Sequence, residues 1–429
     1  MVYDLILRNG TLVTSTETFK AEVGVKNGKI SFIGNLQDSK TAQNVYDATG
    51  LYILPGIIDA HVHFREPGLT HKEDFKTGSM AAASGGITFI ADMPNTVPPT
   101  STVNEFNKKL SIARKKSCIG FGLFALLTNE NIDEIPGLVK AGALGFKVFL
   151  GTSTGNIAAP SSALLAEQLR ICTGFGKRTG FHAETSEINK TSTALCKEKL
   201  HQCPYDPPFG LILSQARPIE SEVLAIKKAV DLARTADAMI HIHHITCKEG
   251  IEIVANAKKE GINVTAETCP HYLFLNAENS SYKCYPPIRR EEHRLALWQA
   301  VKQGDIDMIA TDHAPHTLEE KSLSLWEAPA GLAGIETLVN LMLSEVNKGA
   351  ITLNDFVRLC SEQPAKIWNI KNKGKLAIGA DADFTIVDMN KKVKIDYLKM
   401  KSKSKTTPYH GWELKGASVA TIIRGKPVV

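Results

Sequence analysis

Short apolar runs recur along the middle of the chain, with helix-like stretches between most of them. The helix-like stretches include residues 221–234 and 290–302. Strand and helix alternating eight times predicts an α/β fold, a parallel (β/α)8 TIM barrel. A doubly wound open sheet is the alternative, but no G-x-G-x-x-G follows a strand. The eight apolar runs lie at residues 56–63, 87–93, 119–125, 144–150, 179–183, 238–244, 263–268 and 308–312.

The two ends of the chain have a different pattern. Turn signals interrupt their apolar runs, and Asn9-Gly10 after the first run is a hairpin signal. We expect one small β-sandwich domain built from residues 1–52 and 375–429, and a barrel over residues 53–374. The predicted strands of the small domain lie at residues 5–8, 21–25, 29–34, 383–388 and 417–425.

Composition and charge narrow the class of protein. The chain has 429 residues, of which 43% are hydrophobic and 22% charged, as is usual for globular proteins. The net charge is +5, but the basic residues are spread out, so we expect no nucleic acid partner. The densest basic run, residues 399–405, is expected to be a solvated surface segment. No stretch approaches 18 apolar residues, so we expect no membrane span.

The cysteines and the N-terminus indicate the cellular compartment of the protein. None of the eight cysteines forms a C-x-x-C pair, and they are scattered along the chain. The first ten residues lack the basic and apolar regions of a signal peptide. Both features favour reduced thiols and a cytoplasmic protein.

The strongest local motif is Asp59-Ala-His61-Val-His63, at the end of the first predicted barrel strand. Alternate residues of a strand face the same way, so His61 and His63 project together. The carboxyl end of barrel strands is where barrel enzymes have their active sites. Two imidazoles on one face are a suitable start for a Zn²⁺ site, although two core histidines would give the same motif.

Other strand ends add further ligand types. His182 closes the fifth strand, and Asp312 closes the eighth. Lys147 lies inside the apolar fourth strand, where burial would lower its pKa and favour the neutral amine. A neutral amine can take up CO₂ as a carbamate that bridges two metal ions; a lysine paired with an acid is the alternative. The sixth strand ends with His241, His243 and His244, and spacing alone does not choose among them.

The order of these residues along the strands closely resembles the metal-ligand set of the amidohydrolase superfamily. The resemblance covers almost the whole chain, including the divided β domain. It selects the last histidine of the sixth strand through the pattern His-Ile-His-His-Ile-Thr. The residues that match the ligand set are His61, His63, Lys147, His182, His244 and Asp312.

The resemblance also implies what these ligands do. One metal ion is expected at the His-x-His pair and Asp312, and a second at His182 and His244. A CO₂-derived carbamate on Lys147 and a hydroxide would bridge them. Zn²⁺ suits this donor set, with two ions per subunit, although Co²⁺ or Mn²⁺ could substitute. Asp312 would be the catalytic acid and base.

Finer motifs resemble dihydroorotases. His63-Phe-Arg65-Glu-Pro-Gly places Arg65 on the same side as the histidines, where its planar fork can bind a carboxylate. A surface salt bridge, for example with Glu66, is the alternative for Arg65. Asp92-Met-Pro-Asn95 and His316, four residues after the last ligand, are also dihydroorotase-like. By this resemblance Arg65, Asn95 and His316 bind the substrate carboxylate.

Two further segments concern the substrate ring. Ala330 and Gly331 belong to a loop whose backbone contacts the pyrimidine ring in that family. Lys-x-Asn-Pro-Pro-x-Arg is common there, but Tyr285 stands at the asparagine position of Lys283-Cys-Tyr-Pro-Pro-Ile-Arg. Tyrosine can still hydrogen-bond, but its reach differs from that of an amide. The departure leaves open how the ring is held.

We therefore expect a dihydroorotase that interconverts dihydroorotate and N-carbamoyl-aspartate in pyrimidine biosynthesis. Another cyclic amidase, allantoinase or hydantoinase, is the first alternative because it shares the metal ligands. A catalytically silent scaffold relative is the second. A homodimer is a family expectation, and no membrane partner is expected.

Overall fold

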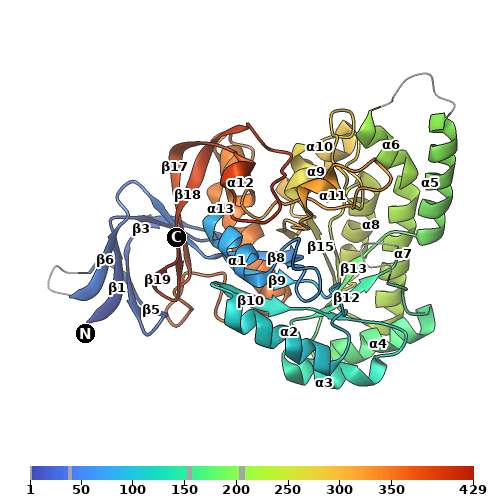
Figure 1. The fold of residues 1–429 in the computed structure, drawn as a ribbon. Helices are drawn as coiled ribbons and strands as arrows, with labels where there is room; N and C mark the ends of the chain where they lie inside the picture. Colours follow the sequence, from blue (N-terminus) through green and yellow to red (C-terminus); the bar gives the residue numbers. More distant parts are fainter. Residues whose placement is uncertain (1, 37–40, 152–156, 202–207) are drawn as a thin grey trace.

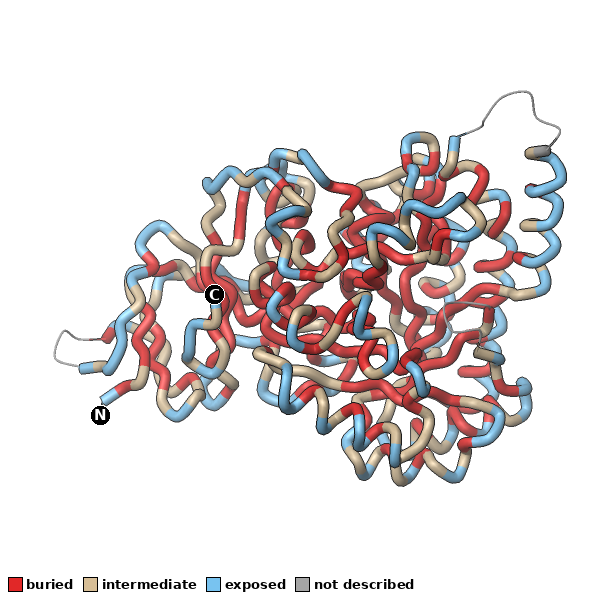
Figure 2. Tube along the Cα trace, in the orientation of Figure 1, coloured by how far each residue is buried: buried red, intermediate tan, exposed pale blue. Residues whose placement is uncertain are grey.

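The computed structural model describes residues 2–36, 41–151, 157–201 and 208–429. A barrel and a smaller β domain lie side by side, and both ends of the chain lie in the β domain (Figure 1). The buried segments are concentrated along the barrel strands and where the two domains meet (Figure 2). Within the described residues, no helix is long and apolar enough to cross a membrane.

The barrel strands are parallel and follow one another in chain order. One sheet has the order β10-β9-β8 and the next β11-β12-β13-β14-β15-β16. All eight predicted runs contain such a strand, so the barrel prediction is confirmed. The strands are β8 (Ile57–Val62), β9 (Ile87–Asp92), β10 (Gly120–Leu123), β11 (Ala125–Leu126), β12 (Phe146–Phe149), β13 (Thr179–His182), β14 (Ile240–Ile242), β15 (Val264–Thr268) and β16 (Met308–Ile309).

Two seams join these sheets into a closed barrel. At the first, the chain runs from β10 directly into β11, which pairs with β12. At the second, Val62 and His313 form a parallel bridge, and the His63 amide donates to the His313 carbonyl at 2.8 Å. The second seam therefore closes next to the predicted metal ligands.

Helices surround the barrel and cover the outer faces of its strands (Figure 1). Their buried faces are apolar, as in α7, where Ala225, Ile226, Ala229 and Val230 are buried. The two helix-like stretches predicted from the sequence match α7 and α10. The longer helices are α1 (Phe75–Ser84), α2 (Val103–Lys116), α3 (Ile135–Ala141), α4 (Ser162–Gly174), α5 (Ser186–His201), α6 (Phe209–Ala216), α7 (Ile219–Ala236), α8 (Lys248–Lys259), α10 (Glu291–Gln303) and α12 (Leu338–Asn347).

Shorter helical segments lie in the loops and after the eighth strand. A π-helical turn, Arg358–Glu362, connects two of them, and its Ser361 hydroxyl donates to the Pro55 carbonyl just before β8. The short helices are α9 (Pro270–Phe274), α11 (Leu318–Lys321), α13 (Leu353–Val357) and α14 (Gln363–Ile367), with 3₁₀ turns at Ile132–Glu134 and Tyr397–Lys399.

The β domain combines strands from both chain ends in two sheets. Their orders are β5-β4-β1-β6 and β19-β18-β17-β7-β2-β3. β7 pairs with β17 through Leu54 and Thr385, so the second sheet links the start of the chain to its end. The strands are β1 (Tyr3–Arg8), β2 (Thr11–Val13), β3 (Thr18–Lys20), β4 (Glu22–Lys26), β5 (Lys29–Gly34), β6 (Ala42–Asp47), β7 (Tyr52–Pro55), β17 (Phe384–Lys394), β18 (Glu413–Ile423) and β19 (Lys426–Pro427).

The two Asn-Gly turns near the start of the chain behave differently. Asn27 and Gly28 have φ values of 50° and 73° and join the antiparallel pair β4 and β5. The hairpin predicted at Asn9-Gly10 is wrong, because β1 and β2 belong to different sheets. Asn9 also has a positive φ, but its turn directs the chain from one sheet to the other.

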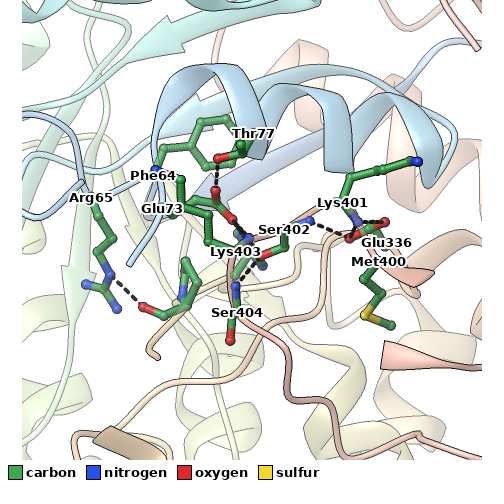
Figure 3. A network of polar contacts seen from close by, with 12 residues as sticks. Phe64, Arg65, Glu73, Thr77, Glu336, Met400, Lys401, Ser402, Lys403 and Ser404 are labelled. Atoms are coloured by element: carbon green, nitrogen blue, oxygen red, sulfur yellow. Dashed lines mark hydrogen bonds and ion pairs between the residues drawn. The ribbon is translucent and has the colours of Figure 1, made fainter. Parts of the chain in front are cut away.

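The basic run at residues 399–405 is only partly the solvated surface that its charge suggested. Lys399 and Lys401 are exposed, but Ser402 and Ser404 are buried. Lysine and serine alternate, and alternate residues of an extended chain face opposite ways. The Ser402 hydroxyl donates to Glu73 at 2.5 Å, and the segment packs against the start of α1 (Figure 3).

The same segment fastens the loops around the barrel mouth. The Ser404 hydroxyl donates to the His316 carbonyl at 2.8 Å, and Lys403 pairs with Asp74 at 2.7 Å. The backbone amides of Lys401 and Ser402 donate to Glu336. The segment from residue 400 to 404 thus holds three loops together.

The cysteines that the structure describes are all free thiols. Most are buried, and burial raises the pKa of several, such as that of Cys172 to about 12. Cys203 lies outside the described residues. The buried thiols are therefore core residues.

Candidate metal centre and substrate pocket

The first group of ligand-type atoms lies at the carboxyl end of β8 and just after β16. The Nε2 atoms of His61 and His63 lie 3.3 Å and 3.1 Å from Oδ1 of Asp312. The ligand atoms of these three residues are all within 4.8 Å of one another. Although burial opposes it, the two histidines hold the pKa of Asp312 well below its usual range. The carboxylate is therefore ionised, as a metal ligand requires.

Three residues of the site have left-handed backbone conformations. The φ values of Arg65, His244 and Asp312 are 63°, 41° and 46°. Such conformations in non-glycine residues cost about 1–3 kcal/mol each and persist where the surrounding structure fixes them. At Asp312, Asp59 provides part of this support by accepting from the Thr311 amide at 3.0 Å.

The second group lies at the ends of the fifth and sixth strands. Nδ1 of His182 is 3.0 Å from Nε2 of His244. Zn–N distances are about 2.0–2.1 Å, so two nitrogens this close can bind one ion. Burial lowers the pKa of both rings, which keeps them neutral and able to offer a lone pair.

Lys147 lies on β12 between these two groups. Its side chain is fully buried, and its Nζ has no hydrogen-bond partner among the described residues. Burial lowers the pKa of Lys147 to about 7, and the acids Glu267 and Asp312 only partly oppose this. A lysine paired with an acid is thus not what the structure shows. A buried amine without a partner fits an anionic modification that ligates metal.

Each of three ligand histidines is held from behind by a polar group. Nδ1 of His61 contacts Glu267, Nδ1 of His63 lies 2.7 Å from Oδ1 of Asn95, and Nε2 of His182 lies 3.0 Å from Glu184. These oxygens accept the ring N–H, so the other nitrogen of each ring has its lone pair toward the cavity. Such outer partners fix the tautomer and orientation of metal-binding histidines.

A further group of ligand-type atoms, His61, His243 and Glu267, also lies within 4.8 Å. Here Glu267 accepts from His243 at 2.9 Å and from His241 at 3.1 Å. His243 packs so closely on Gly180 that a Cβ there would lie 2.0 Å from its Nε2. We assign Glu267, His241 and His243 to support of the site, because both histidines hydrogen-bond to Glu267 and none of the three residues lines the cavity.

The six predicted ligands fit a two-metal site. Their lone pairs converge on one cavity, their histidines are neutral, and Asp312 is ionised. Of the six, only Lys147 must first be modified, as a carbamate, before it can ligate metal as predicted. The structure thus brings all six residues together, while their individual roles stay predictions.

One small cavity connects these ligands with most of the predicted substrate residues. Its volume is about 30 Å³, which has room for only a few water molecules. The lining residues are His61, His63, Arg65, Asn95, Lys147, Phe149, His182, His244, Tyr285, Asp312, Ala314, Ala330 and Gly331.

Arg65 is a buried cation on the wall of this cavity. Only 2% of its surface is exposed, and its Nε donates to the Pro315 carbonyl at 3.2 Å. In the part of the chain that the structure describes, no carboxylate lies within 4.0 Å of its guanidinium. Glu66 pairs with Lys116 instead, which excludes the surface salt bridge considered from the sequence. Burying a charge is costly without a partner, so an anionic ligand would complete the site.

The structure treats the two predicted pocket residues His316 and Tyr285 differently. His316 lies behind Arg65 and is not part of the cavity wall, because the loop of Ala330 and Gly331 stands between. Tyr285 does line the cavity, and its ring stacks on Arg217 at 3.6 Å from the guanidinium carbon. Arg217 in turn binds Glu184, the partner of His182.

The supporting acids Glu184 and Glu267 were not singled out from the sequence. Glu267 lies within the apolar strand β15, which is the same signal that identified Lys147. Glu184 is two residues after His182 and faces the same way. An acidic residue inside an apolar strand is therefore a sequence signal that could have identified Glu267.

Comparisons with known proteins bear on the whole chain. Residues 52–428 match the amidohydrolase family. The chain is 34% identical to an allantoinase of Deinococcus radiodurans, over 100% of this chain and 96% of that protein. It is 35% identical to a dihydroorotase of Methanosphaera stadtmanae, over 94% of this chain and 91% of that protein.

Solved structures give the same fold. An L-hydantoinase (dihydropyrimidinase) from Arthrobacter aurescens superimposes with a TM-score of 0.95 at 32% identity, covering 100% of this chain and 96% of that chain. A D-hydantoinase superimposes with a TM-score of 0.90 at 30% identity, covering 99% and 95%. The names of these similar proteins differ in substrate, so overall similarity does not choose among them.

Proposed function

Because this chain belongs to the amidohydrolase family and is a cyclic amide hydrolase, we propose that its substrate is dihydroorotate. The observation that supports this most directly is the buried guanidinium of Arg65 beside the metal ligands, with no carboxylate partner in the described chain. Dihydroorotate has a carboxylate on its ring, whereas hydantoin and allantoin have none. A bidentate contact between the two would neutralise the buried charge.

The proposed reaction is reversible hydrolysis of dihydroorotate to N-carbamoyl-aspartate, the ring closure of pyrimidine synthesis in reverse. Two bound metal ions would polarise the ring carbonyl and lower the pKa of the attacking water. Asp312 accepts the proton of that water as its oxygen bonds to the carbonyl carbon. Asp312 then returns the proton to the ring nitrogen as the carbon–nitrogen bond breaks.

The metal chemistry belongs to the same proposal. The hydrolase is metal-binding, and neutral histidines with a carboxylate suit Zn²⁺, with two ions per subunit. A carbamate on Lys147 would bridge them. The lowered pKa and the lack of a partner at Nζ support this, because only the neutral amine reacts with CO₂. The homodimer, the cytoplasmic location and the absence of nucleic acid or membrane partners also stay proposals.

Tyr285 is the residue that favours the alternative function, that of another cyclic amidase. It takes the place of an amide expected to hold the ring, and its stacking on Arg217 restricts its movement. Tyr285 lines the same cavity as Ala330 and Gly331. We therefore keep allantoinase and hydantoinase activity as the alternatives that the experiment must separate.

The test compares three substrates on protein purified with zinc and bicarbonate. We expect turnover of dihydroorotate but not of allantoin or hydantoin, and no turnover by Asp312→Ala. Arg65→Met should raise the KM for dihydroorotate roughly 10- to 100-fold, since a charged hydrogen bond is lost. Arg290→Met, which changes an exposed arginine, is the matched control. Preference for allantoin or hydantoin would overturn the substrate assignment but not the metal site.

A further inference from the structure

The side chain of His316 has donors on both sides. Lys72 Nζ lies 3.2 Å from its Nδ1, and Arg65 Nη2 lies 3.2 Å from its Nε2. The Ala330 carbonyl lies 3.0 Å from the same Nε2. The ring is 1% exposed, so these groups determine its state.

Two of these three contacts favour the same tautomer. An ammonium can only donate, so the Lys72 contact requires Nδ1 of His316 to accept and to bear no proton. A carbonyl can only accept, so the Ala330 contact requires the single N–H of the neutral ring on Nε2. The guanidinium of Arg65 also can only donate, so its contact with Nε2 alone favours the opposite tautomer. The opposite tautomer would place an N–H against the Lys72 ammonium, and its other acceptor, Glu320 Oε2, is farther away at 3.5 Å.

With Nε2 protonated, the N–H groups of Arg65 and His316 face each other at 3.2 Å. An acceptor such as a carboxylate oxygen, bound beside both groups, would relieve this contact between two donors. Gly331 lines the cavity and contacts the His316 ring, and a Cβ at that position would lie 3.1 Å from Nε2. Because Gly331 has no side chain, only its backbone stands between the ring nitrogen and the cavity at this position.

Lys72 is itself well anchored for this purpose. Its Nζ pairs with Glu320 Oε1 at 2.9 Å, and its side chain is 12% exposed. Glu320 is fixed in turn by a capping box with Thr317 at the start of α11. The ammonium therefore has a defined place beside Nδ1.

We propose that Lys72 is a positioning residue for the substrate carboxylate, because it holds His316 in the Nε2-protonated tautomer. This inference rests on the proposed function, since it concerns the carboxylate of the same substrate. Lys72 does not line the cavity and acts only through His316.

The experiment compares Lys72→Met and Lys72→Arg with a matched control, Lys403→Met. Lys403 also anchors the loop before α1, by pairing with Asp74 and donating to the Thr70 carbonyl, but it does not contact His316. We expect Lys72→Met to raise the KM for dihydroorotate roughly tenfold or more with kcat within about threefold, since a hydrogen bond to a charged ligand is lost. Lys72→Arg should restore the KM, and Lys403→Met should leave it unchanged.

A second readout does not depend on turnover. The ¹⁵N shifts of labelled histidine, with His316 assigned by its loss in His316→Asn, report which ring nitrogen bears the proton. We expect Nε2 to be protonated in the wild type and in Lys72→Arg, and the Nδ1-protonated form to appear in Lys72→Met. A wild-type ring protonated on Nδ1, or an equal KM effect of Lys403→Met, would overturn the inference.

The two proposals fail differently. If the wild type hydrolyses only ureides without a carboxylate, the proposed function fails and the role of Lys72 toward a carboxylate fails with it, although the tautomer is still measured. If dihydroorotate is hydrolysed and Lys72→Met leaves both KM and tautomer unchanged, only the role of Lys72 is wrong.

Discussion

Single side chains behind the metal ligands decide how well those ligands are oriented. Glu267 is buried and accepts hydrogen bonds from His61 of β8 and from His241 of β14. It contacts His61, a ligand that stands 206 positions earlier in the chain. The metal ligands were predictable from the sequence, because they lie at the ends of predicted strands. Their hydrogen-bond partners were not, because Glu267 and His61 are far apart in the sequence and meet only in the fold.

The first prediction concerns Glu267. Glu267→Gln would replace an acceptor oxygen by an amide N–H, which opposes the N–H groups of its histidine partners. We expect zinc affinity to fall roughly 10- to 100-fold, as for other outer partners of metal ligands. Competition with a chelator measures it. Glu336→Gln changes a carboxylate bound only to backbone amides in the described chain and is the control; equal losses in both variants would contradict the assignment.

The second prediction concerns Lys321. Its Nζ donates to the carbonyls of Lys283, Pro329 and Gly331, and so fixes the loops that bear Tyr285 and Ala330. Burial lowers the pKa of Lys321 to about 8, so it is charged below that pH and neutral above it. The neutral amine has two N–H groups for three carbonyls.

We therefore expect the KM for substrate to rise between pH 7 and pH 9 more steeply in the wild type than in Lys321→Met. The variant should have a raised KM at every pH because it lacks all three hydrogen bonds. Steady-state kinetics across this range measure the effect. Parallel pH profiles for the two proteins would show that Lys321 does not contribute.

At the scale of elements, the barrel strands were predictable because each is a buried apolar run in a repeated order. The turn at Asn9-Gly10 was misassigned because a local turn signal does not say which sheet the next strand joins. The positive φ values of Arg65, His244 and Asp312 were equally beyond the sequence, since they depend on contacts between strands. The pattern of apolar residues therefore predicted the strands, whereas contacts between strands decided which sheet each strand joins.

A buried ion pair fastens α2 to the barrel and supplies the third prediction. Lys109 Nζ lies 2.6 Å from Asp92 at the end of β9, and both side chains are fully buried. Asp92 also accepts from the Phe64 amide, beside His63 and Arg65. Lys109→Met would leave Asp92 as an unpaired buried charge, which costs about 3–5 kcal/mol.

Urea unfolding measures that loss. Lys108→Met is the matched control, because Lys108 immediately precedes Lys109 on the same helix and its side chain is 59% exposed. Its effect should be within about 0.5 kcal/mol. Similar stabilities for the two variants would mean that Asp92 is compensated by its backbone contacts alone.

At the scale of the whole molecule, the proposed metal ligands join distant parts of the barrel. They come from the first, fourth, fifth, sixth and eighth strands, and the seam between β8 and β16 closes beside them. The sequence predicted this fold and the ligand set because both follow one repeated pattern. It predicted the substrate less firmly, because that depends on a few side chains such as Arg65 and Tyr285.

The fourth prediction is that metal binding stabilises the entire fold. A ligand that binds only the folded state adds about 2.7 kcal/mol at a free concentration 100 times its Kd. We expect the midpoint of thermal unfolding to fall when zinc is removed with a chelator and to recover when it is returned. In Asp312→Asn the recovery should be smaller. An unchanged midpoint would mean that the ligands are held in place without metal.

Because the β domain contains strands from both chain ends, it can be completed only late in the synthesis of the chain. Leu54 of β7 pairs with Thr385 of β17, which is 331 positions later (385 − 54). At about 5–20 residues per second, a ribosome needs roughly 15 to 65 seconds to make that stretch. Throughout this interval the first strands have unpaired edges while the barrel is being made. The nascent chain is thus most exposed to strand-edge association at its oldest residues, and a chaperone that shields those edges would protect it best.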